Sequence, residues 1–237
     1  MRTPIPTVTA AQMGEVDRVV TEEFGLPIVS LRENAGRGLA TLAAQKLREL
    51  EERTVLCLAG KGGNGGGGLS ACRHLANWGV SAEAIAVEPT LGTPAEIQAR
   101  VLREAGVPVR SPASLSRVDG TSFDLVLDAI LGYSGRRDPR GPVRDMVEIA
   151  NGARHVVALD LPSGLDPATG KPRNPCVRAE ATLTLALPKP GLLRPEATPY
   201  VGELWLGDLG IPDAVYARLG IRVPRLFRPG QIVRRLT

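Results

Sequence analysis

The chain has 237 residues, of which 43% are hydrophobic, an ordinary proportion for a globular protein with a buried core. This composition excludes a disordered or fibrous protein. The net charge is only +4, and two tryptophans, three tyrosines and three phenylalanines leave few rings for stacking on bases. The composition therefore argues against a nucleic-acid partner.

The cysteines suggest a reducing compartment. Cys57, Cys72 and Cys176 are odd in number and lack the spacing of a zinc site or a disulfide framework. The sequence has neither the apolar stretch of a signal peptide nor the roughly 18 consecutive apolar residues of a membrane span. We therefore expect a cytoplasmic protein that makes no contact with a membrane.

Two helices are predicted before any strand, the first capped by Thr9 and the second beginning at Pro27. The apolar run Val55–Ala59 is typical of a strand buried on both faces of a parallel sheet. Further helices are predicted at 69–78, 94–104, 143–150 and 212–219, and strands at 82–87, 123–130, 155–161, 181–187 and 203–206. This alternation predicts one α/β domain over residues 1–237, with a mostly parallel central sheet and helices on both faces.

The C-terminal segment from Arg218 carries six arginines and no acidic residue. We interpret it as a solvated or packed C-terminal arm, because charge runs usually lie on the surface. A patch that binds a polyanion is the alternative interpretation.

A run of seven glycines in nine residues, Gly60–Gly68, follows the first predicted strand and precedes a predicted helix. Glycine lets a ligand approach the backbone closely, and amide groups at a helix start can bind an anion. The run therefore predicts a phosphate-binding loop, with a tight strand-to-helix turn as the alternative. A Walker loop is excluded because no Gly-Lys-Ser/Thr follows.

The same run also matches the dinucleotide-binding pattern Gly60-x-Gly62-x-x-Gly65. Glu88 lies near the end of the next predicted strand, where an acid that binds ribose would lie. An NAD-dependent oxidoreductase is therefore a second hypothesis, although this pattern alone is a weak signal.

Acidic residues lie at the ends of two other predicted strands. Ligands of doubly wound sheets bind at the carboxyl ends of strands, so Asp128, Asp160 and the glycine run are expected to meet at one crevice. A carboxylate within the apolar sequence around Asp160 needs a partner, which indicates a catalytic or ligand-binding role, with a structural cap as the alternative.

Polar residues near these strand ends suggest further roles. Asn64, Asp128 and Ser163 offer oxygen ligands that could, with loop carbonyls, hold a hard cation. Lys189 lies between two prolines, so we expect a rigidly placed cation that meets a phosphate or a carboxylate, with an exposed turn as the alternative, and we take it as a candidate catalytic residue.

Six separated motifs resemble the NAD(P)HX epimerase family, also called the YjeF N-terminal domain. They are Glu33–Gly36, Gly60–Gly68, Asp128–Gly132, Ala158–Asp166, Pro188–Leu192 and Gly207–Pro212. The resemblance implies a three-layer Rossmann-like fold and interconversion of the R and S forms of hydrated NADH and NADPH, which carry a hydroxyl at C6 of the reduced nicotinamide ring. It also implies a separate dehydratase in the same pathway, and a homodimer for which the apolar N-terminal helices would supply the face.

The resemblance also implies roles for individual residues. Potassium ligands fall on Asn64, Asp128 and Ser163, so a potassium ion is the expected cofactor. Asp160 is implied as the acid or base that acts at C6, and the loop amides would hold the pyrophosphate. Substrate contacts fall on Asn64, Gly65, Gly66, Gly67, Gly132, Tyr133, Ser134, Gly135, Arg136, Arg137, Asp138 and Asp160.

The glycine run departs from the family. The family loop typically reads Asn-Asn-Gly-Gly-Asp-Gly, whereas Gly63 and Gly67 replace its first asparagine and its aspartate here. The segment Tyr133–Asp138, with two arginines, also differs from the small Gly-Thr-Gly sequence of the family. The alternative function is therefore a module with impaired catalysis that binds a nucleotide, RNA or a protein on the same fold.

Overall fold

The computed structural model describes residues 5–48, 53–135 and 137–236. Its strands are β1 (Thr54–Ala59), β2 (Ser81–Ala86), β3 (Val109–Arg110), β4 (Leu125–Ala129), β5 (Val156–Leu159), β6 (Ala181–Leu185), β7 (Glu203–Gly207) and β8 (Val233–Arg235). Its α-helices are α1 (Ala10–Arg18), α2 (Ile28–Leu47), α3 (Gly63–Asn77), α4 (Pro94–Glu104), α5 (Pro142–Gly152), α6 (Thr198–Val201) and α7 (Asp213–Arg218).

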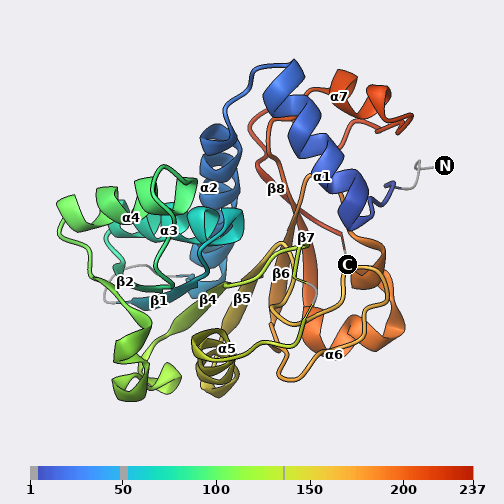
Figure 1. Cartoon of the computed structure of the whole chain (residues 1–237). Coiled ribbons are helices and arrows are strands. Elements are labelled where there is room, and N and C mark those ends of the chain that lie inside the picture. Colours follow the sequence, from blue (N-terminus) through green and yellow to red (C-terminus); the bar gives the residue numbers. More distant parts are fainter. Residues whose placement is uncertain (1–4, 49–52, 136, 237) are drawn as a thin grey trace.

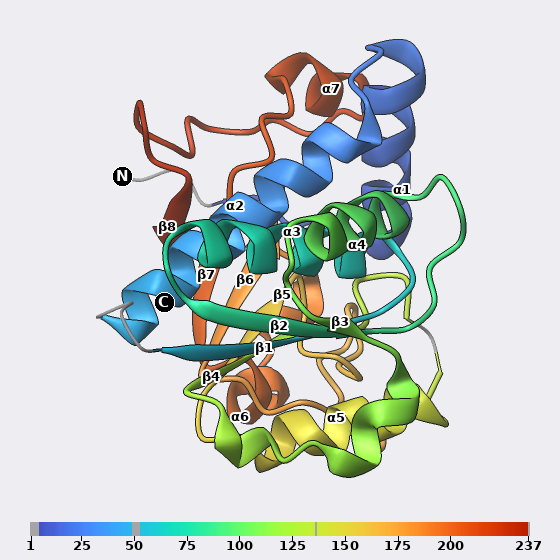
Figure 2. The same cartoon turned by 90° about the vertical axis from the view of Figure 1, so that its left-hand side faces the viewer.

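In the described residues, the strands form one eight-stranded sheet in the order β3-β2-β1-β4-β5-β6-β7-β8. The pairs from β3 to β7 are all parallel, and only β8 runs antiparallel to its neighbour. Helices α2, α3 and α4 cover one face, and α5 and α6 lie on the other (Figures 1 and 2). The predicted three-layer α/β fold is therefore confirmed.

Alternation along β1 divides the core between the two faces of the sheet. Val55, Cys57 and Ala59 pack against the helices of one face, whereas Leu56 and Leu58 belong to the core under α5. All five side chains are fully buried, so the strand reads as a continuous apolar run.

The order of the strands fixes where a ligand can bind. β1 lies between β2 and β4 in the sheet. The connection that leaves β1 leads to α3 on one face, whereas the connection that leaves β4 leads to α5 on the other face (Figure 2). This topological switch point leaves a crevice beyond the carboxyl ends of the two strands.

The two N-terminal helices begin where the sequence predicts. Thr9 caps α1 with a capping box, in which its hydroxyl accepts from the Gln12 N–H and its own N–H donates to the Gln12 side chain. The apolar residues of these helices, including Met13 and Leu39, are buried in the core of the same chain. Whether these helices also supply a dimer face stays a prediction.

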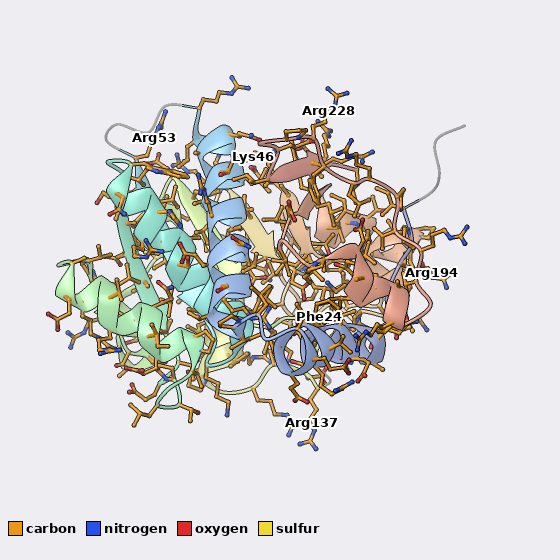
Figure 3. The ribbon with its side chains drawn as sticks, turned by 90° about the horizontal axis from the view of Figure 1, so that it is seen from above. Phe24, Lys46, Arg53, Arg137, Arg194 and Arg228 are labelled. Carbon is orange, nitrogen blue, oxygen red and sulfur yellow. The ribbon has the colours of Figure 1, made fainter. Side chains whose placement is uncertain are left out.

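The C-terminal arm is packed, as predicted. β8 pairs with β7, with Arg235 opposite Trp205, although some of the arm's arginines, such as Arg228, point away from the molecule (Figure 3). The sequence missed β8 because two of its three residues are arginines, and missed β3 because it is two residues long. Among the described residues, none of the helices combines the length and the apolar content that crossing a bilayer requires.

Candidate functional site

A cavity of about 510 Å³ lies at the switch point of the sheet. Its walls come from the ends of β1, β2, β4, β5 and β6 and from the N-terminal helices. The residues that line it are Met13, Arg32, Gly60, Lys61, Gly62, Gly63, Asn64, Val87, Ile130, Leu131, Gly132, Tyr133, Ser134, Val143, Asp160, Leu185, Lys189 and Leu209.

The glycine run forms the start of α3 rather than a loop before it. The helix begins at Gly63, six residues earlier than its predicted start at Leu69, and the preceding residue Gly62 makes no side-chain cap hydrogen bond. The first N–H bonded within the helix is that of Gly66, which donates to the Gly62 carbonyl at 3.1 Å. The N–H groups of the first turn are thus left without intrahelical acceptors, at the end of the helix where Gly62, Gly63 and Asn64 line the cavity.

Close packing explains the later glycines of the run. A Cβ atom on Gly65 would lie 1.7 Å from the Gly60 carbonyl oxygen, and one on Gly68 would lie 2.3 Å from the Ala129 Cβ. A Cβ on Gly67 would lie 2.8 Å from Leu159 Cδ2. These glycines let α3 approach the sheet, so the interpretation that the whole run serves a phosphate was too broad.

Of the predicted substrate contacts in this run, Asn64 lines the cavity. Gly65, Gly66 and Gly67 are buried, and none of them is among the described residues that line it. A substrate contact through these three residues stays a prediction that their burial does not favour.

Asp160 follows β5 and has the partners that its apolar surroundings require. It is 3% exposed and adopts a left-handed backbone conformation, with φ of 69°, that residues other than glycine rarely adopt. One carboxylate oxygen accepts a hydrogen bond from Lys189 Nζ, and the other accepts from the Tyr133 N–H at 3.0 Å. The prediction that Asp160 needs a partner is confirmed.

Lys189 is buried beside this carboxylate. It is 1% exposed, and its ammonium group also donates to the Leu185 carbonyl at 3.0 Å. The expectation that it meets a phosphate or a carboxylate is thus met by Asp160. The two charges neutralise each other, which makes the burial of both tolerable.

Asp128 lies beneath the cavity and does not line it. The carboxylate is fully buried and accepts hydrogen bonds from the Ser163 N–H at 2.7 Å, the Ser163 hydroxyl at 2.5 Å and the Ile130 N–H at 3.2 Å. Burial raises the pKa of Asp128 to about 6, although the Ser163 hydrogen bonds act in the opposite direction. Of the two acids predicted to meet at the crevice, Asp160 lines the cavity and Asp128 does not.

The third predicted cation ligand has a different partner. The Asn64 side-chain amide donates to the Leu159 carbonyl at 3.1 Å, whereas Asp128 and Ser163 bond to each other. A Cβ on Gly132 would lie 3.4 Å from Asn64 Cγ and 3.3 Å from Asp160 Oδ2. Asn64 thus lies next to Gly132, in the connection that follows β4.

The segment after β4 is split between two hollows. Gly132, Tyr133 and Ser134 line the cavity, as predicted for substrate contacts. Gly135, Arg137 and Asp138 instead line an adjoining hollow of about 380 Å³, and Arg137 points outward (Figure 3). The prediction for Arg136 lies outside the described residues.

Sequence reasoning missed the contribution of the N-terminal helices to the cavity, above all Arg32 in the first turns of α2. Arg32 donates to Asp17 Oδ2 at 3.0 Å, and the Tyr133 hydroxyl donates to the same oxygen at 3.1 Å. The signal that could have identified Arg32 is its position as a charged residue directly before the motif Glu33–Gly36.

The motif Glu33–Gly36 holds neighbouring segments of the cavity wall in place. Asn34 donates to the Leu209 carbonyl at 2.8 Å and so fixes the segment that closes one side of the cavity. A Cβ on Gly36 would lie 2.4 Å from the Ser70 Cβ, so glycine allows α2 and α3 to cross closely. Glu33 binds Arg73, His74 and Ser70; although desolvation raises its pKa, these hydrogen bonds lower it to about 2.

Comparison with known proteins decides the family. Residues 29–191 match the family model described as YjeF-related protein N-terminus. The chain belongs to this family. It is 44% identical to the NAD(P)H-hydrate epimerase of Dehalogenimonas lykanthroporepellens, over 97% of this chain and 93% of the relative. It is 35% identical to the enzyme of the same name from Rhodopirellula baltica, over 88% of this chain and 86% of the relative.

A longer relative is the bifunctional NAD(P)H-hydrate repair enzyme Nnr of Moorella thermoacetica, which is 35% identical over 89% of this chain but only 41% of its own length. The yeast protein YNL200c has the same fold, with a TM-score of 0.82 over 98% of this chain and all of the yeast chain, at 23% identity.

The oxidoreductase hypothesis required Glu88 to bind the ribose of a dinucleotide. Among the described residues near the end of β2, Val87 lines the cavity and Glu88 does not, so this hypothesis is not favoured.

Proposed function

We propose that this protein is an NAD(P)H-hydrate epimerase, which interconverts the R and S forms of hydrated NADH and NADPH. The relatives that match nearly the whole chain bear this name. The observation that carries the proposal is one cavity lined both by the open start of α3 and by the Lys189–Asp160 pair.

The start of α3 is suited to the pyrophosphate of the substrate. Free amide groups and the positive end of the helix dipole attract an anion, and glycine at 62, where nothing lies within 4 Å of an added Cβ, leaves the backbone open to it. The nicotinamide end would then extend toward Tyr133 and Asp160 along the apolar wall formed by Ile130 and Leu131. This orientation brings the reacting carbon to the acid.

Asp160 is the group suited to proton transfer at C6. Inversion requires the C6–hydroxyl bond to break and to form again from the opposite face, and the ring nitrogen lone pair can stabilise the carbon between these events. The departing hydroxyl takes a proton to leave as water, and the water that adds returns a proton, so protons balance. Because Asp160 is ionised in its ion pair, we assign both transfers to the Lys189–Asp160 pair: the Lys189 ammonium is the proton source, and the Asp160 carboxylate, held also by the Tyr133 N–H, passes the proton to the hydroxyl and takes it back from the water that adds.

A potassium ion fits the residues around Asp128. The carboxylate is fully buried, and the described groups that contact it are neutral N–H and O–H donors, so its charge has no opposite charge against it. We propose Asn64, Asp128 and Ser163 as the residues that hold the ion, and a bound cation would supply the missing positive charge next to the substrate cavity.

The alternative of a binding module with impaired catalysis is not favoured. The ion pair proposed for catalysis is intact, and the aspartate missing at position 67 would point toward Leu159 and Ala35 rather than into open space.

We further propose that a separate dehydratase consumes one epimer, since the longer relatives are named as bifunctional repair enzymes. A cytoplasmic location fits three buried free cysteines, and a homodimer stays a prediction.

The test is the rate at which one purified epimer of hydrated NADH becomes the mixture. Wild-type protein should speed this approach to equilibrium well beyond the spontaneous rate, and Asp160→Asn should abolish the acceleration while the protein stays folded. A wild-type rate equal to that in buffer alone would reject the function.

A further inference from the structure

We propose that Arg32 is a substrate-binding residue whose guanidinium binds the pyrophosphate of the hydrated dinucleotide, together with the amides at the start of α3. The inference deepens the proposed function and rests on it for the identity of the substrate. It concerns a side chain from α2 that none of the sequence motifs includes.

Arg32 lies directly against the start of α3. A Cβ atom on Gly63 would lie 2.6 Å from Arg32 Nε and 3.0 Å from both Cζ and Nη2. The guanidinium therefore occupies the space that any side chain at position 63 would need.

The same guanidinium faces the cavity. Arg32 lines it together with Gly62 and Gly63, and its side chain is 13% exposed. Lys61, two residues before the start of the helix, also lines the cavity. Two cationic residues thus line the cavity together with the amide groups, which favours an anion over an apolar or cationic group.

Arg32 is held in place without using all its donors. Its Nη2 donates to Asp17 Oδ2 at 3.0 Å, whereas among the described residues its Nε and Asp17 Oδ1 are buried and have no hydrogen-bond partner. The pair is therefore not the bidentate contact that satisfies both groups, and guanidinium donors remain for a phosphate.

Asp17 also connects Arg32 to the residues around Asp160. The oxygen that accepts from Arg32 also accepts from the Tyr133 hydroxyl, while the Tyr133 N–H donates to Asp160. A phosphate held by Arg32 is thereby placed in fixed register with the acid. Loss of Arg32 should weaken the hold on the substrate more than it slows the chemical step.

The test compares two substrates in Arg32→Met, in Arg32→Lys and in the matched control Arg37→Met, which changes an exposed arginine of the same helix. With hydrated NADH, Arg32→Met should raise KM about 10- to 100-fold with kcat changed less than about 3-fold. Arg32→Lys should give a smaller rise, because lysine keeps the charge but loses the planar fork. Arg37→Met should behave as wild type.

The second substrate is hydrated, reduced nicotinamide riboside, which has no phosphate. Its kcat/KM should be the same in wild type and in Arg32→Met. Equal losses with both substrates, or an unchanged KM for hydrated NADH, would overturn the proposal and leave Arg32 as a structural link between α1 and α2.

Binding of ADP-ribose, measured by calorimetry, separates this proposal from the function. Arg32→Met should weaken ADP-ribose binding by a similar factor even if no epimerisation is found, in which case the proposed function fails and the role of Arg32 stands. Equal affinity of wild type and variant, or no binding to either, would overturn the role of Arg32 whatever the activity.

Discussion

Gly67→Asp restores the aspartate of the family loop and tests whether the glycine run serves packing or ligand binding. The structure predicts that this change damages the fold instead of improving the enzyme. A Cβ at position 67 would lie 2.8 Å from Leu159 Cδ2 and 3.5 Å from Ala35 Cβ, and the nearest polar atom is the Arg32 carbonyl oxygen at 3.8 Å. A carboxylate there meets a fully buried leucine and an acceptor that cannot donate to it.

The expected cost follows from these contacts. Overpacking a tight core costs about 1–3 kcal/mol, and a buried carboxylate without a partner costs about 3–5 kcal/mol. Better helix propensity than glycine returns only about 0.5 kcal/mol. The free energy of unfolding should therefore fall by about 4 kcal/mol or more, which for a chain of this size lowers Tm by roughly 10 °C.

The assay is a thermal melt beside the epimerisation rate. Gly14→Asp is the matched control, because it places the same residue in a helix where nothing lies within 4 Å of the added Cβ, and it should change Tm by less than about 2 °C. If Gly67→Asp kept the wild-type Tm and epimerised faster than wild type, position 67 would face the substrate and the packing explanation would be wrong.

Two further predictions concern the buried charges. Lys189→Met should lower the free energy of unfolding by about 3–5 kcal/mol in denaturant titrations, because it leaves Asp160 buried without its cation; an unchanged midpoint would contradict the ion pair. For Asp128, whose folded pKa is raised to about 6 from 3.8, stability should fall as pH rises between these values and stay low above about 6, by about 3 kcal/mol in the absence of a bound cation. Potassium binds the ionised form of Asp128, so potassium chloride should raise Tm relative to tetramethylammonium chloride above pH 6 and not below pH 4. Asp128→Asn should remove this difference. A potassium effect on Tm that survives in Asp128→Asn would exclude this site.

The sequence was sufficient for elements whose own pattern is complete. The run Val55–Ala59 and the helix that begins at Pro94 were predicted almost to the residue, because an apolar strand and an N-terminal proline with Thr93 as cap are local signals. The partner of Asp160 could be expected in kind but not in identity, since Lys189 is 29 residues away and only the fold brings them together.

The start of α3 could not be predicted from local propensity. Glycine is a poor helix former, so the pattern placed the helix at Leu69, whereas tertiary packing against Gly60, Ala129 and Leu159 makes glycine the residue that fits from position 65 onward. Arg32 escaped prediction for a related reason. Its role depends on the empty side-chain position at Gly63, which is distant in sequence and visible only when the two helices are seen together.

A structure of the Asp160→Asn variant with one epimer of hydrated NADH bound would test the central claim most directly. We predict the pyrophosphate at the amides of Gly63 and Asn64 beside Arg32, and the C6 hydroxyl of the ring within hydrogen-bonding distance of the side chain at position 160. A dinucleotide bound in the reverse direction, or outside the cavity between α3 and Lys189, would contradict it.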